Sequence, residues 1–217
     1  GKDFIARKSR YCLWLKDILP SELKKYPKIM ERVKNVREFR LSCPSPDTNH
    51  YADKPTFPVR LRYYSEDRIN PALALPKVSS QNRRYIPMEV IDADVIAGSK
   101  LFLIPDISLY HFGVLTSNVH MAWMRTVCGR LKSDYSYASN VVYNTFPWPE
   151  PTAQQRQKIE QTAQAILDAR ALYPDSSLAD LYDELTMPPE LRKAHRQNDM
   201  AVMQAYGFTK GSEAYKS

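Results

Sequence analysis

The chain has 217 residues, of which 43% are hydrophobic and 25% charged, as in globular proteins that bury a full core. No apolar run approaches the roughly 20 residues that a membrane-spanning helix requires, which excludes a helical membrane protein. The net charge of +7 is uneven: residues 1–148 hold 23 basic and 14 acidic side chains, whereas residues 149–217 hold 8 and 10. The basic N-terminal two-thirds favours a polyanionic partner.

Cysteine and histidine usage argues against disulfides and metals. Cys12, Cys43 and Cys128 are odd in number and widely spaced, which is typical of reduced thiols in a cytoplasmic protein. The start of the chain has no apolar signal segment, which agrees with a cytoplasmic location. Without a CxxC pair, and with four scattered histidines, the spacing predicts no metal site.

The first elements predicted are a strand and a basic helix. Residues 10–15 (RYCLWL) read as a short buried strand, and residues 21–43 place Ile29, Val33 and Val36 at helical spacing. The other positions of this helix predict a basic exterior, which lies either along phosphates or in a salt-bridged solvent face: Lys28, Arg32, Lys34, Arg37 and Arg40. Residues 44–58 are rich in Pro, Asp and Asn and predict an irregular loop.

Short β-rich segments and a longer helix follow. Turns separate the predicted strands, at residues 58–64, 83–91 and 99–105. Residues 107–129 predict one helix that ends at Gly129 and has an apolar stripe of Leu115, Val119, Ala122 and Trp123. Together these elements predict a mixed α/β (α+β) fold, with a mixed sheet.

A polar and aromatic alternation begins after Leu131. Because strand side chains have a period of two, Tyr135 and Tyr137 are expected on one face of a strand. Lys132, Asp134 and Ser136 are then expected on the other face. Without further information, an exposed face with a Lys–Asp ion pair is the simplest interpretation.

Residues 146–151 (FPWPEP) form a stiff connector that is hostile to helices. Thr152 and Gln155 then have the spacing of a capping box, and the sequence beyond them reads as helical. The sequence therefore predicts two parts, a domain over residues 1–148 and a helical subdomain over residues 149–217.

Catalytic motifs are absent, so no catalytic residue is assigned. The chain has six glycines and neither GxGxxG nor GxxxxGK[ST], and Asn70-Pro71-Ala72 fails the Asn-Pro-Pro-aromatic signature of amino-methylating enzymes. Two functions other than the binding of a polyanion stay open. One is a metal-dependent nuclease domain built on Pro46-Asp47, Pro105-Asp106 and Pro174-Asp175, and the other is a structural docking domain without DNA.

A series of segments in one fixed order carries a family resemblance: residues 79–88 (SSQNRRYIPM), 108–138 (SLYHFGVLTSNVHMAWMRTVCGRLKSDYSYA), 141–149 (VVYNTFPWP), 166–170 (ILDAR), 177–183 (SLADLYD) and 187–195 (MPPELRKAH). The chain resembles the C-terminal portion of the MmeI-like (type IIL) restriction-modification polypeptides and their methyltransferase-only relatives, from about Phe4 to Phe208. The portion that it resembles comprises a target recognition domain and C-terminal helices.

The resemblance implies a sequence-specific module for double-stranded DNA that performs no chemistry itself. In that family the methyl transfer from S-adenosylmethionine to adenine N6 belongs to an upstream methyltransferase domain of the same polypeptide. We therefore expect no cofactor in this segment, with S-adenosylmethionine, and Mg²⁺ if the parent cleaves DNA, bound elsewhere in the parent.

The resemblance also assigns base-reading positions within the GRL-x-S-x-Y-x-Y segment, and these are Lys132, Asp134 and Ser136 here. Lys donates to guanine O6 and N7, and Asp accepts from cytosine N4. We therefore expect Lys132 and Asp134 to read one G·C pair, and Ser136 to act with Lys100. Four arginines that border the region are expected to bind phosphates: Arg83, Arg84, Arg125 and Arg130.

Overall fold

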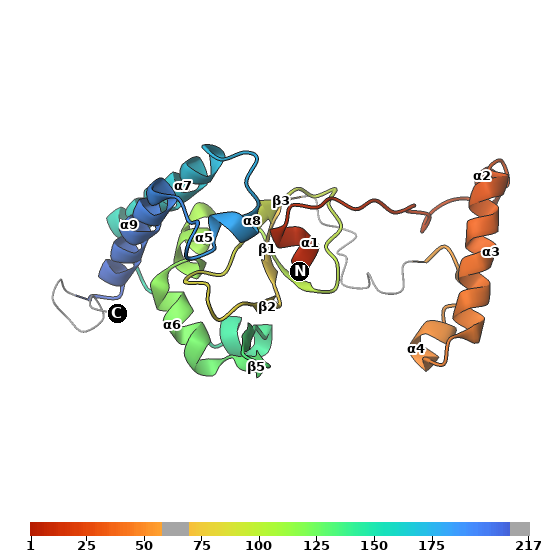
Figure 1. Ribbon diagram of the computed structural model, residues 1–217, viewed down its shortest axis with the longest axis horizontal. Helices are drawn as coiled ribbons and strands as arrows, with labels where there is room; N and C mark the ends of the chain where they lie inside the picture. The colour runs from red at the N-terminus through yellow and green to blue at the C-terminus, as the bar shows by residue number, and fades with distance from the viewer. Residues whose placement is uncertain (58–69, 209–217) are drawn as a thin grey trace. The chain divides into compact units, whose positions relative to one another are not determined.

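The computed structural model describes residues 1–57 and 70–208. Its contacts divide the chain into two compact units, one of residues 10–65 and one of residues 1–9 together with 66–217 (Figure 1). The strand predicted at residues 58–64 lies outside the described residues.

The unit of residues 10–65 is helical where it is described. It contains α2 (Pro20–Leu23), α3 (Pro27–Ser42) and α4 (Pro46–Asn49), each of which begins with a proline at its first position. The predicted helix is confirmed as α3, and α4 adds one helical turn to the predicted loop. The strand predicted at residues 10–15 is wrong, because these residues pair with no strand and Tyr11 is 95% exposed.

One predicted member of the basic exterior of α3 is buried instead. The Arg40 guanidinium donates hydrogen bonds to the carbonyl oxygens of Tyr51, Lys54 and Phe57, at 3.0, 2.7 and 2.7 Å. The predicted surface role of Arg40 is therefore wrong, because its guanidinium closes the loop that follows α3 with three hydrogen bonds. Two other basic residues of α3 form ion pairs, Lys34 with Glu38 and Arg37 with Asp53.

Two small antiparallel sheets share one central chain segment in the other unit. The buried strand β1 (Ala72–Pro76) lies between β3 (Glu89–Ile91) and β4 (Leu101–Pro105). After Lys77 the chain continues as β2 (Val78–Ser79), which pairs with β6 (Asp134–Ser136), and β6 pairs with β5 (Gly129–Leu131). The strands predicted within 83–91 and 99–105 are confirmed as β3 and β4.

The single helix predicted over residues 107–129 is two helices, α5 (Leu109–Leu115) and α6 (Asn118–Val127). Ser117 separates them because it has extended backbone and its hydroxyl accepts the His120 N–H as the N-cap of α6. The helical stripe prediction therefore missed a cap inside the apolar pattern. Gly129 does not end the helix in a left-handed conformation but opens β5.

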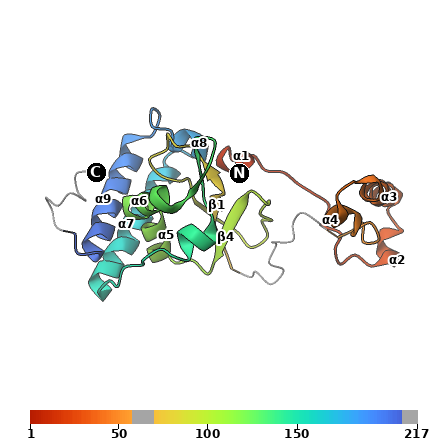
Figure 2. The same ribbon diagram turned by 90° about the horizontal axis from the view of Figure 1, so that it is seen from below.

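The C-terminal helices pack onto the same core as the sheets. Two long helices, α7 (Ala153–Ala171) and α9 (Pro189–Ala205), lie side by side next to α5 (Figures 1 and 2). The capping box of Thr152 and Gln155 is present at the start of α7. A π-helical turn (Ser139–Tyr143), α8 (Leu178–Leu181) and α1 (Lys2–Ile5) complete the unit.

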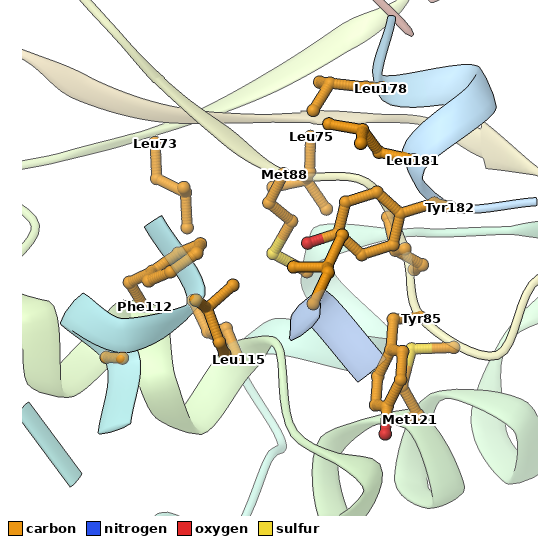
Figure 3. Packing of buried hydrophobic residues seen from close by; sticks show 14 of the residues in the cluster. Leu73, Leu75, Tyr85, Met88, Phe112, Leu115, Met121, Leu178, Leu181 and Tyr182 are labelled. Carbon is orange, nitrogen blue, oxygen red and sulfur yellow. The ribbon is translucent and has the colours of Figure 1, made fainter. Parts of the chain in front are cut away.

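The core shows why residues 149–208 are not separate from the sheets. Leu178 and Leu181 of α8 pack near Leu73 and Leu75 of β1, in one cluster with Phe112 of α5 (Figure 3). The two parts expected from the sequence thus share one hydrophobic core. The observed mixture of helices and small sheets confirms the mixed α/β (α+β) prediction. The expectation of a mixed sheet is wrong for the described strands, whose pairs are all antiparallel.

Gly113 sets the close approach of α5 to α7 and gives a stability prediction. A Cβ atom at this position would lie 2.7 Å from Ile159 Cγ2 and 3.1 Å from Ala163 Cβ. Overpacking of this kind lowers the free energy of unfolding by about 1–3 kcal/mol. The higher helix propensity of alanine offsets about 1 kcal/mol of this loss. We expect Gly113→Ala to lower the free energy of urea unfolding by up to about 2 kcal/mol.

Gly98→Ala is the matched control, because a Cβ atom there meets nothing within 4 Å. It should change the free energy of unfolding by less than about 0.5 kcal/mol. Equal effects of the two variants would show that helix contact does not require Gly113.

Candidate nucleic-acid interface

The segment predicted as one strand is a tight hairpin. β5 and β6 pair antiparallel with Leu131 opposite Asp134, so Lys132 and Ser133 form a two-residue loop. The prediction that Lys132, Asp134 and Ser136 share one strand face is therefore wrong for Lys132, which lies at the hairpin tip. Asp134 and Ser136 remain on one face of β6, two residues apart.

The Lys132 backbone has φ of +56°, in the left-handed region. Two-residue hairpin loops require positive φ at their first position, where Gly or Asn is the usual residue. A lysine there costs about 1–2 kcal/mol relative to glycine. The fold therefore presents an ammonium group at the tip at a cost to its own stability.

The two faces of the hairpin differ as the alternation predicts. Tyr135 and Tyr137 are buried, at 8% and 4% exposure, whereas Lys132 is exposed. Among residues 1–57 and 70–208, no side chain forms an ion pair with Lys132 or Asp134, and the two do not pair with each other. The ion pair of the simplest interpretation is therefore absent, and Lys132 and Asp134 each lack an ionic partner within the described ranges.

Buried aromatic groups hold the hairpin to the core. The Tyr137 hydroxyl and Nε2 of His120 in α6 lie 3.2 Å apart. Burial lowers the pKa of His120 to about 4, so the imidazole is neutral near pH 7.

The Tyr137 N–H also donates to the Lys77 carbonyl, and the Lys77 N–H donates to the Lys100 carbonyl. Lys77 thus links the exposed Lys100 segment to the residue after β6 through the backbone, and the partnership of Lys100 with Ser136 stays a prediction.

Three of the four arginines predicted to bind phosphate line one cavity. This cavity has a volume of about 380 Å³ and is lined by Arg83, Arg84 and Arg125, with Gln81, Asn82, Asn118, Ala122 and Glu184. Arg125 donates a hydrogen bond of 2.9 Å to the Arg84 carbonyl, and Glu184 is paired with Arg192 at 2.9 Å. The cavity is therefore cationic and has the donors that a phosphate group accepts.

Two buried polar atoms at this cavity lack partners within the described part of the chain, namely Arg83 Nε and Asn118 Oδ1. A buried N–H without an acceptor is costly, and an anion would satisfy it. The cavity runs along one face of α6, since Asn118, Ala122 and Arg125 are spaced at i, i+4 and i+7. The C-terminal end of that helix leads directly into the hairpin.

Arg130 does not line the cavity with the other three arginines. Its guanidinium lies 4.1 Å from the centroid of the Tyr135 ring and donates to the Ser133 carbonyl at 3.0 Å. The structure therefore places the four arginines in two different environments.

A carboxylate that the sequence did not single out anchors the start of α6. Asp199 of α9 accepts a 2.6 Å hydrogen bond from the Tyr85 hydroxyl and a 2.8 Å hydrogen bond from the Asn118 N–H. No local pattern identifies this role, because the partners lie 114 and 81 residues away. Asp199 therefore connects the C-terminal helices to Tyr85, which follows Arg83 and Arg84, and to α6, the helix that precedes the hairpin.

The described residues show neither a metal centre nor a membrane-spanning helix. No group of three or more His, Cys, Asp or Glu side chains within the described ranges is arranged to hold a metal ion. None of the helices there combines the length and the apolar character of a membrane span. Among the Pro-Asp dipeptides, Asp47 lies in α4 and Asp106 accepts a hydrogen bond from Asn70.

The Asp199 anchor gives a prediction about pH. Burial raises the pKa of Asp199 to about 6, from 3.8, although Tyr85 and Asn118 oppose the shift with their hydrogen bonds. Between those values the folded state binds more protons than the unfolded state, so this group's contribution to stability falls as pH rises. From pH 4 to 7 the free energy of unfolding should fall by about 2–3 kcal/mol relative to Asp199→Asn.

Urea unfolding of both proteins at pH 4, 5, 6 and 7 tests this prediction. Asp168→Asn, at an exposed position of α7, controls for the loss of one carboxylate. Parallel curves for the wild-type and Asp199→Asn proteins would contradict the raised pKa.

Comparisons with known proteins identify the family. The family model described as MmeI, target recognition domain, matches residues 1–150, and the model of the MmeI C-terminal domain matches residues 151–216. DNA methyltransferase A of Bacillus subtilis is 38% identical over 204 residues, which are 94% of this chain and 23% of that protein.

A solved structure, that of the type IIL restriction-modification enzyme MmeI in complex with DNA, superposes with a TM-score of 0.90 and 41% identity. The match covers 99% of this chain and 28% of MmeI, so the chain spans about a quarter of the length of these relatives. The chain thus belongs to the MmeI family, of which it comprises the target recognition and C-terminal domains.

Proposed function

We propose that this chain is the sequence-recognition module through which a larger DNA adenine-N6 methyltransferase or restriction-modification polypeptide binds duplex DNA. The observation that carries the proposal is the exposed hairpin tip with unpaired Lys132 and Asp134, in a chain of the MmeI family. The solved MmeI structure contains DNA, which supports the same partner for this chain.

The hairpin suits the DNA major groove, which admits a two-stranded β-ribbon. Lys132 projects from the tip, and Asp134 follows as the first residue of β6. Their chemistry is complementary to one G·C pair, with lysine donating to guanine O6 and N7 and aspartate accepting from cytosine N4. Ser136, with Lys100 beyond it, contacts a neighbouring pair.

The arginine cavity supplies the sequence-independent part of binding. Arg83, Arg84 and Arg125 bind a backbone phosphate there, which fixes the register of the hairpin on the duplex. Because the cavity wall includes one face of α6, and α6 leads into β5, phosphate binding and base reading are joined by one rigid helix.

We assign the chemistry to the rest of the parent polypeptide. The described residues contain neither a glycine-rich nucleotide loop nor a group of three or more His, Cys, Asp or Glu side chains that could hold a metal ion. The parent polypeptide binds S-adenosylmethionine in its methyltransferase domain, binds Mg²⁺ if it also cleaves, and acts in the cytoplasm. DNA methyltransferase A, which is about four times longer than the matched region, supports a parent with methyltransferase activity.

Exchange of the two reading charges tests base recognition. Lys132→Glu combined with Asp134→Arg reverses donor and acceptor, so the preferred pair should change from guanine to cytosine on the strand nearer to residue 132. Selection of preferred duplexes from a randomised library measures the change at every position. If the exchanged protein prefers guanine at every position where the wild-type protein prefers it, the assignment is contradicted.

Removal of the cavity arginines tests phosphate binding. Arg83→Ala and Arg125→Ala should each weaken binding to all duplexes by a similar factor and lower the slope of log K against log salt by about 0.9. Lys158→Ala, at an exposed position of α7, removes the same charge as a control and should leave the slope unchanged. A change in base preference without a change in slope would contradict the phosphate role.

A further inference from the structure

Arg130 is exposed and lies on the same face of the hairpin as Tyr135. It lies directly opposite Tyr135 in the pairing of β5 with β6, and residues opposite each other in an antiparallel pair share one face. The guanidinium stacks over the Tyr135 ring with 4.1 Å between its central carbon and the ring centroid. Because Tyr135 belongs to the buried core, this contact fixes the Arg130 side chain against the body of the protein.

The same guanidinium bonds the loop that carries the reading lysine. Its Nη1 atom donates to the carbonyl oxygen of Ser133, at 3.0 Å. That carbonyl lies between Lys132, with its positive φ, and Asp134, the first residue of β6. One side chain therefore contacts both the opposite strand and the peptide group between the two reading residues.

The loop has little else to hold it. β5 and β6 have three residues each, and a hairpin of this size is marginal by itself. Within residues 1–57 and 70–208, no other side chain forms a hydrogen bond with the backbone of residues 131–134. The unfavourable φ of Lys132 thus depends on the surrounding contacts for its persistence.

We infer that Arg130 is a positioning residue for base recognition: it clamps the Lys132–Ser133 loop against Tyr135 so that Lys132 and Asp134 are held in reading geometry. The inference rests on the proposed function, that this hairpin reads bases. It differs from the expectation that Arg130 binds phosphate like Arg83 and Arg125, because its donor is directed to the protein's own loop.

Lysine does not substitute for arginine in this role. A planar guanidinium donates hydrogen bonds in its plane while its face stacks on an aromatic ring. An ammonium group has no such plane, so Arg130→Lys keeps the charge and loses the combination of contacts. Arg156→Lys is the matched control, because the Arg156 guanidinium also stacks over a tyrosine ring, that of Tyr110 at 4.5 Å, but lies in α7 and outside the hairpin.

The experiment compares wild-type protein with Arg130→Lys, Arg130→Ala and Arg156→Lys. Preferred duplexes are first selected from a randomised library with the wild-type protein. Dissociation constants are then measured for the preferred duplex, for its single-pair variants and for a random duplex, at several salt concentrations. Amide hydrogen exchange of the free proteins, followed by NMR, reports on the hairpin without DNA.

The inference predicts a loss at one base pair only. Arg130→Lys should reduce discrimination at the pair read by Lys132 and Asp134 at least about fivefold. Affinity for the random duplex should stay within about twofold and the salt slope within about 0.3 of wild type, since no phosphate contact is lost. The amides of residues 131 and 134 should exchange faster, whereas those of α7 should not change.

Two results would overturn the inference. One is wild-type discrimination at every pair in Arg130→Lys, and the other is an equal loss on all duplexes in Arg130→Ala with a salt slope lower by about 0.9, the signature of a phosphate contact. A wild-type protein without any sequence preference would instead refute the proposed function.

If Arg130→Lys does not fold, two variants of Tyr135 test the same inference. Tyr135→Phe keeps the ring and should read DNA as the wild type does, whereas Tyr135→Leu removes the stacking surface and should reproduce the single-pair loss. Equal behaviour of the two Tyr135 variants would overturn the inference.

Discussion

A hairpin with three-residue strands does not hold one conformation alone, so the proposed reading surface depends on how it is fixed to the core. The fixation comes from the alternation of side chains along β6. Tyr135 and Tyr137 enter the core, and because neighbouring side chains point to opposite faces, Asp134 and Ser136 face away from it. Burial of two aromatic rings thereby determines where the polar groups point, and substitutions on the polar face leave the buried contacts intact.

Helix α6 is one link between the hairpin and the rest of the protein, beside the pairing of β6 with β2. α6 begins at the Asp199 anchor, has the arginine cavity along one face and contacts Tyr137 through His120 before it leads into β5. Because the anchor residue belongs to α9, the C-terminal helices are part of the same support. This explains why a helical tail packs into the core of a recognition domain instead of forming a body of its own.

Much of this arrangement was predictable from the sequence, and the failures have identifiable causes. The α3 and α7 helices and the outward direction of Asp134 follow from periodicity and capping residues, which are local signals. Periodicity failed where a two-residue loop without glycine interrupted the alternation at Lys132, and where Ser117 capped a new helix within an apolar pattern. Arg40 and Asp199 were missed because their partners are set by tertiary contacts. The proposal that Lys132, Asp134 and Ser136 read bases came from the family resemblance. The comparisons confirm the family.

The central claim is that the β5–β6 hairpin enters the major groove at the recognised pair. The C5 position of a pyrimidine lies in that groove, so a duplex with 5-iodocytosine at single positions reports on what contacts it there. Irradiation of the complex, followed by mass spectrometry of the cross-linked peptides, identifies the contacting residues. The account predicts cross-links within residues 129–137 when the iodinated base belongs to the pair read by Lys132 and Asp134. Cross-links at that pair that fall only in other segments, with none in the hairpin, would contradict it.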